Sequence, residues 1–199
     1  MAHGKNWRSF PRDIPGWALR LFDPLVHAVT VTPHEHRLIH DGMTFHATAR
    51  VPTLADGASI DWLMSVPAGS YPHMTTFEFQ LSAGEVDIKT YEGVTTSADG
   101  TPVTQWNRNR NSSNTPDLLM FSAPTVTDLG TEFHDRYVPP TAGGVGARAG
   151  TLAPNFGEEW ILKPSTKYLV RLTNNSGAAI TLTGEALWYE PSYEVDEPN

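Results

Sequence analysis

Short apolar stretches with a two-residue repeat constrain this chain more than any other feature of its sequence. In residues 74–81 (MTTFEFQL), Phe77, Phe79 and Leu81 alternate with polar side chains, which is the pattern of a strand buried on one face. Similar stretches recur at short intervals and show no 3.6-residue repeat of an amphipathic helix. The predicted strands are 24–31, 43–51, 59–66, 74–81, 85–95, 118–126, 133–138, 159–163, 167–173 and 179–189.

The number of predicted strands limits the possible folds. About eight to ten strands in an open sheet tend to fold over or close, which leaves a sandwich, a jelly roll or a barrel. We expect an all-β fold, specifically an antiparallel jelly-roll β-sandwich with an extended N-terminal arm and long loops. The arm is predicted for residues 1–23, the sandwich for 24–190 and an acidic tail for 191–199. The turn residues 174–177 (NNSG) predict a hairpin.

Composition excludes several classes of protein. The chain has no cysteine, so it holds no disulfide or thiolate metal site, and this agrees with folding in a reducing cytoplasm. We expect no secretion signal in the first residues and no stretch of about 18 apolar residues that spans a membrane. The net charge is −8, and residues 1–23 carry four bases against two acids, which leaves −10 for the rest. Such an acidic body predicts no nucleic-acid partner.

The N-terminal arm combines aromatic and basic side chains. Its candidate partner-binding residues are Trp7, Arg8, Phe10, Arg12 and Trp17. Pro11 and Pro15 prevent a long helix in this segment. The aromatic side chains either close one end of the core or lie against a neighbouring subunit, because large aromatics anchor interfaces.

Two predicted loops carry further candidate contacts. Arg108 and Arg110 lie in the asparagine-rich stretch 105–116 (QWNRNRNSSNTP), and Arg148 lies in the loop 139–150 (PPTAGGVGARAG). Exposed arginines bind carbonyl and carboxylate groups of a partner; otherwise they are solvated loop tips. The four glycines of the second loop predict that it is mobile or ordered only by a partner.

Motifs that carry chemistry are weak in this sequence. His34, His36 and His40 have a spacing that would bind a divalent metal from a strand, but they match the first cupin motif poorly; otherwise they form a polar loop before a strand. Glu78 and Asp87 would face each other if their strands were adjacent. The sequence contains no nucleophile elbow and no phosphate-binding loop. We therefore expect no enzyme activity, no cofactor and no metal.

Several blocks of the sequence resemble small virion proteins of tailed bacteriophages. The blocks are 87–93 (DIKTYEG), 97–101 (SADGT), 107–113 (NRNRNSS), 160–174 (WILKPSTKYLVRLTN) and 187–190 (LWYE). The resemblance covers roughly residues 59–190 and implies the capsid decoration, or cement, class. Proteins of that class are jelly rolls that sit on the outer shell as trimers or dimers and clamp capsomers; they have no catalytic motif.

The resemblance implies the major capsid protein and further copies of the chain as partners, as a homotrimer in preference to a homodimer. It implies synthesis in the host cytoplasm and a final location on the outer surface of the virion, with no membrane partner. A different class remains open, a carbohydrate- or receptor-binding module of a fibre or baseplate. In that case Trp62, Trp106, Trp160 or Trp188 would stack on a sugar ring. A cupin-like metal-binding protein is the third alternative.

Overall fold

The computed structural model describes residues 22–23, 28–29, 34–82, 84–140, 147–152 and 159–191. The chain divides into two compact units, residues 1–37 and 38–199. In the first unit, β1 (Phe22–Asp23) pairs antiparallel with β2 (Ala28–Val29). Within the described segments, no helix is long and apolar enough to cross a membrane.

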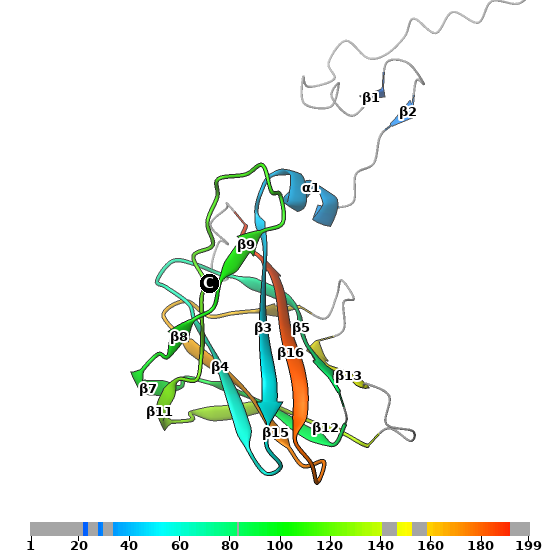
Figure 1. The fold of residues 1–199 in the computed structure, drawn as a ribbon. Coiled ribbons are helices and arrows are strands. Elements are labelled where there is room, and N and C mark those ends of the chain that lie inside the picture. The colour runs from blue at the N-terminus through cyan, green and yellow to red at the C-terminus, as the bar shows by residue number, and fades with distance from the viewer. Residues whose placement is uncertain are drawn as a thin grey trace, which may run out of the picture. The chain divides into compact units, whose positions relative to one another are not determined.

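The second unit is built almost entirely of strands (Figure 1). Among the described residues there is one helix, α1 (His34–His40), and the boundary between the two units falls within it. The strands are β3 (Thr44–Leu54), β4 (Ser59–Ser65), β5 (His73–Leu81), β6 (Val86–Glu92), β7 (Thr95–Ala98), β8 (Thr101–Pro102), β9 (Gln105–Asn107), β10 (Leu119–Ser122), β11 (Thr125–Asp128), β12 (Thr131–Val138), β13 (Ala147–Leu152), β14 (Trp160–Ile161), β15 (Lys167–Asn174) and β16 (Ile180–Tyr189).

Two antiparallel sheets make up the body of this unit. Sheet I has the strand order β13-β5-β16-β3-β9, with β14 also paired to β5, and sheet II has the order β12-β6-β15-β4-β10-β8. The four consecutive strands β3 to β6 alternate between the two sheets, and so do β13, β15 and β16. The central strands are therefore ordered β3-β16-β5-β13 in one sheet and β4-β15-β6-β12 in the other. The predicted all-β antiparallel architecture is confirmed.

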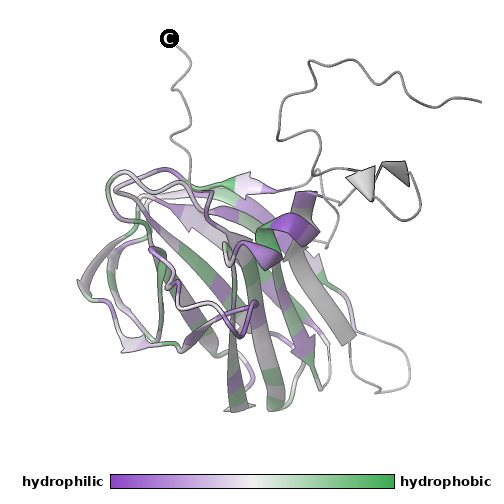
Figure 2. Cartoon of the chain, turned by 90° about the horizontal axis from the view of Figure 1, so that it is seen from above, coloured by the Kyte–Doolittle hydropathy of each residue, from purple (hydrophilic) through white to green (hydrophobic). Residues whose placement is uncertain are grey.

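The core lies between the two sheets and follows the two-residue repeat of the strands (Figure 2). Phe77, Phe79 and Leu81 of β5 are buried, as predicted from the alternation. The Trp62 ring of sheet II packs on Phe79 with 4.9 Å between ring centroids. Gly184 of β16 makes room for this pair, because a Cβ atom there would lie 3.2 Å from the Phe79 ring and 3.4 Å from that of Trp62.

An insertion between β6 and β12, residues 93–130, modifies the sandwich. Its strands β10 and β8 extend sheet II beyond β4, and β9 extends sheet I beyond β3. Its remaining strands, β7 and β11, form a separate two-stranded sheet (Figure 1). β11 contributes Val126 to a second, smaller apolar cluster. The cluster consists of Leu63, Tyr91, Val94 and Leu169, with Phe121, Val126 and Leu129 packed against it.

Several predicted element boundaries were wrong. The strand predicted for 118–126 is two strands, β10 and β11, separated by Ala123 (φ 53°) and Pro124. The strand predicted for 85–95 is likewise divided into β6 and β7 at Gly93, whose φ of 76° suits glycine. Part of the predicted glycine-rich loop forms the start of β13, and the short strands β8 and β9 were not predicted.

Candidate partner-binding surface

The asparagine-rich loop after β9 begins at a buried side chain. Asn107 is only 7% exposed. Its Nδ2 donates hydrogen bonds to the carbonyl oxygens of Gly42, at 2.8 Å, and Asn114, at 3.1 Å. Its Oδ1 accepts the backbone N–H of Asn109 at 2.8 Å. Both ends of the loop are thus tied to the turn between α1 and β3.

Further asparagines hold the rest of this loop. Asn109 donates from Nδ2 to the carbonyl of His40 at 2.9 Å, and its Oδ1 accepts the N–H of Asn111 at 3.1 Å. Asn114 donates from Nδ2 to the carbonyl of Gly42 at 3.3 Å. Asparagine side chains that bond to nearby backbone replace the ladder bonds of a strand. The backbone of this loop is therefore held in a defined conformation, while the side chains of Arg108 and Arg110 are exposed to solvent.

Glu190 fixes the chain where the loop returns to the sandwich. Its Oε2 accepts the N–H of Asp117 at 2.7 Å, and its Oε1 accepts the N–H of Leu118 at 3.0 Å and the Nε1–H of Trp188 at 2.9 Å. Burial raises the pKa of Glu190, and the two backbone N–H groups oppose that rise. An open pocket of about 460 Å³ lies beside this clamp and is lined by Met43, Phe45, Ser113, Asn114, Thr115, Asp117, Glu190 and Pro191.

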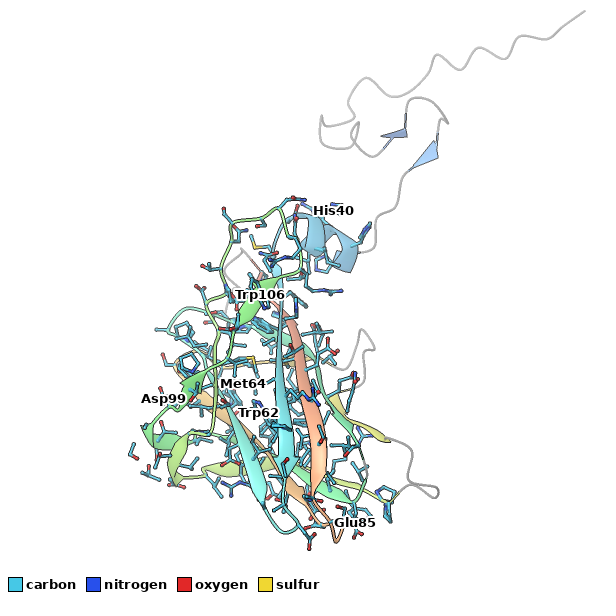
Figure 3. The ribbon with its side chains drawn as sticks, viewed as in Figure 1. His40, Trp62, Met64, Glu85, Asp99 and Trp106 are labelled. Carbon is cyan, nitrogen blue, oxygen red and sulfur yellow. The ribbon has the colours of Figure 1, made fainter. Side chains whose placement is uncertain are left out.

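The fixed loop presents one tryptophan and two arginines, Trp106, Arg108 and Arg110, which we call the Trp–Arg surface. The Trp106 side chain is 46% exposed. The Arg110 Cζ atom lies 4.7 Å from the centroid of the Trp106 ring, and its Nη1 donates to the carbonyl of Asn107 at 3.4 Å. The Arg108 backbone N–H donates to the carbonyl of Thr44 at 2.9 Å, while its side chain is exposed. Trp106 lies at the same end of the ribbon as His40 (Figure 3).

Charged neighbours limit the size of this positive surface. His46 on β3 lies opposite Trp106 on β9. Burial lowers the pKa of His46; Glu185 opposes this effect, and Arg108 and Arg110 add to it. Glu185 in turn lies opposite Glu78 on β5. The outer face of sheet I beside His46 therefore carries two carboxylates on neighbouring strands.

The predicted partner-binding residues fall into three groups. Arg108 and Arg110 belong to the same loop, and both lower the pKa of His46. Arg148 belongs to β13, opposite Gln80, at the other edge of sheet I from β9, and its side chain is not among those described. The five arm residues, Trp7, Arg8, Phe10, Arg12 and Trp17, lie outside the described residues. Their predicted role remains a prediction.

The structure also bears on the alternatives for chemistry. Residues 34–40 form a helix, not a loop or strand, so His34 and His36 point about 200° apart around its axis. In the described part of the chain, no group of three or more His, Asp or Glu side chains could hold a metal ion. The suggested pair of Glu78 and Asp87 was wrong, because the two residues belong to different sheets.

The four tryptophans considered for sugar stacking differ in exposure. Trp62 and Trp188 are core residues, 2% and 1% exposed. Trp160 is half-buried, and its ring contacts those of Phe133 and His134. Trp106 is thus the exposed member of the set, although Arg110 lies over its ring.

Sequence reasoning had not joined Trp106 to Arg108 and Arg110 as one surface. The signal that could have done so is the run of asparagines around them, which favours hydrogen bonds from side chains to the backbone.

In comparisons with known proteins, the chain matches no family model and no curated sequence.

Proposed function

We propose that this protein is a structural virion protein that binds the outer surface of a tailed-phage capsid and clamps neighbouring capsomers. The observation that carries the proposal is the asparagine-rich loop, whose backbone is fixed and whose Trp106, Arg108 and Arg110 side chains face outward. Tryptophan and arginine are the residue types most enriched at interface hot spots. The resemblance of residues 59–190 to decoration proteins supplies the capsid as the partner.

The proposed fold within the sandwich is a jelly roll. Its support is the strand order β3-β16-β5-β13 and β4-β15-β6-β12. A jelly roll has eight strands in two sheets and two Greek-key connections. The insertion 93–130 is then an addition to one connection of the jelly roll, at the place where the Trp–Arg surface is built.

The proposal includes an assembly and a location. The partners are the major capsid protein and further copies of this chain, as a homotrimer in preference to a homodimer. Many copies with closed symmetry compensate for weak single contacts. The protein is made in the host cytoplasm, has no enzymatic role and ends on the outside of the virion.

The test is cosedimentation of the purified full chain with phage heads that lack it. We expect binding, together with a rise in the temperature at which the heads release DNA. Replacing both loop arginines (R108A/R110A) should weaken binding, whereas R50A, at an exposed position on β3 of the same sheet, should not. Heads that neither bind the wild-type chain nor gain heat resistance would contradict the proposal.

A second candidate function, carbohydrate or receptor binding, is favoured by the exposure of Trp106. A glycan array probed with the labelled chain distinguishes the two. Binding to a defined glycan that is lost in W106A, with no binding to heads, would replace the capsid proposal with this one.

A further inference from the structure

We infer that the Trp–Arg surface binds a carboxylate-bearing peptide segment of a protein partner. An Asp or Glu side chain of that segment is held by Arg108 and Arg110, and an adjacent apolar side chain covers Trp106. The inference rests on the proposed function in one respect, that the partner is a protein. It adds the chemistry that the loop recognises.

Arg110 is prepared for such a ligand before the ligand arrives. Its guanidinium lies 4.7 Å above the Trp106 ring, and one nitrogen is bonded to the Asn107 carbonyl. A guanidinium has five N–H donors in a fixed fork that matches a carboxylate. Because stacking already limits the side-chain rotamers, less conformational entropy is lost on binding.

The loop backbone provides the same advantage for both arginines. Asn107 and Asn109, which alternate with the two arginines, hold the backbone of this segment through hydrogen bonds to the carbonyl groups of Gly42 and His40. Arg108 is itself anchored through its backbone N–H to Thr44. Both charged side chains therefore project from fixed Cα positions, and both lie near enough to His46 to lower its pKa.

The surrounding charges favour a short acidic segment over a polyanion. Beyond His46, which pairs with Trp106, sheet I carries Glu185 and Glu78 on neighbouring strands, and the net charge of the chain is −8. A long run of phosphates or sulfates would extend past two arginines onto these carboxylates and be repelled. One or two carboxylates match the positive charge that is present.

Trp106 adds the apolar part of the recognition. Nearly half of its surface is exposed, so a partner side chain such as leucine can bury it. Burial of an aromatic anchor beside a charged contact excludes water from that contact and strengthens it. A segment with acidic and apolar side chains next to each other uses both features.

The test measures binding of a fluorescein-labelled peptide, GLEELG, to the full chain by anisotropy at low and at physiological salt. The matched control peptide is GLQQLG, in which amides replace the carboxylates. We expect the control to bind about tenfold more weakly or worse, because it removes the charge-assisted hydrogen bonds. R110K should also weaken binding severalfold, because lysine keeps the charge but loses the fork.

Protein variants test whether the binding occurs at this surface. R108A/R110A and W106A should each reduce affinity about tenfold, whereas R50A should leave it unchanged. Equal unfolding temperatures of the variants show that the fold is retained. The inference is overturned if GLQQLG binds as well as GLEELG, if R50A weakens binding as much as R108A/R110A, if neither peptide binds, or if heparin binds more tightly than the peptide.

Failure of this inference differs from failure of the proposed function. If the chain cosediments with heads but does not bind the acidic peptide, the capsid role stands and the carboxylate ligand is wrong. If the peptide binds through the arginines while heads do not bind, the surface is an acidic-peptide site in a protein of another role.

Discussion

Two buried asparagines, Asn107 and Asn174, end their strands in the same manner. Asn174 is fully buried, and its Nδ2 donates to the carbonyls of Leu54, at 3.0 Å, and Ala178, at 2.8 Å. Its Oδ1 accepts the N–H of Ser176 at 3.0 Å, as Asn107 accepts that of Asn109. Each site needs two donors and one acceptor, which only an amide side chain of this length provides.

The first prediction replaces Asn107 by aspartate, which keeps the shape but cannot donate. The carbonyls of Gly42 and Asn114 then lose the hydrogen bonds from Asn107 and face a negative charge, and Gly42 keeps only the longer bond from Asn114. We expect N107D to lower the free energy of unfolding by about 2–3 kcal/mol, measured by urea denaturation. The exposed Asn111 of the same loop provides the control, and N111D should change stability by less than about 0.5 kcal/mol. Equal effects of the two substitutions would contradict the role of Asn107.

A second prediction concerns pH. Burial lowers the pKa of His134, Arg136 adds to the shift, and Asp135 opposes it; burial also lowers the pKa of His46. A histidine with a lowered pKa binds fewer protons in the folded than in the unfolded chain. The contribution of such a histidine to the free energy of unfolding is therefore fully present above 6.5, the ordinary pKa of histidine. It is lost as the pH falls through the lowered pKa of the folded state. The free energy of unfolding should decrease below about pH 6.5.

The variant H134Q tests the source of this loss. It should make the decrease between pH 7 and pH 5 shallower in denaturation curves recorded at each pH. Hydrogen bonds to Lys163 and Lys167 lower the pKa values of Glu92 and Asp99. Protonation of these two carboxylates also lowers the free energy of unfolding, but only below about pH 4.5, outside the range of the histidines. An unchanged slope between pH 7 and 5 would exclude His134 as a contributor.

At the scale of elements, the small sheet of β7 and β11 is an attached layer. It contributes to the apolar cluster that buries Leu63 and Leu169 completely. The two strands are paired with each other and to neither sheet I nor sheet II. Apolar burial in this cluster therefore helps to hold the layer in place, together with the hydrogen bonds of the Lys167 ammonium group to Thr96 and Asp99.

The third prediction is that V126S releases this layer without unfolding the sandwich. Loss of the apolar contact costs about 1–2 kcal/mol, so amide hydrogens of β7 and β11 should exchange about tenfold faster. Those of β4 and β15 should exchange at the wild-type rate. T127S, at the exposed neighbouring position, is the control. Faster exchange throughout both sheets would show that the layer and sandwich open together.

At the scale of the whole molecule, one continuous core joins sheets I and II. It contains Trp62, Phe77, Phe79, Val170 and Trp188. The compact unit that contains this core begins at Leu38.

The fourth prediction is that a chain lacking residues 2–23 keeps the thermal unfolding transition of the sandwich, measured by circular dichroism. It should attach less strongly to phage heads. Undiminished attachment would exclude the arm as a contact.

The sequence by itself determined the local features of this protein. Alternation in 74–81 correctly predicted a half-buried strand, and the predicted hairpin turn at 174–177 joins β15 to β16. These features depend on the two-residue geometry of strands and on turn chemistry, which act over a few residues. The helix at His34–His40 was missed because seven residues with no apolar repeat carry little helical signal.

Only the tertiary structure decided how these elements combine. It placed Glu78 and Asp87 in different sheets and buried Trp62 and Trp188 in the core. It also used the asparagines to fix a loop that joins Trp106 to its arginines. Strand partners and registers are set by contacts between residues far apart in the chain, so a local pattern shows that a strand exists but not which sheet it joins or what lies beside it.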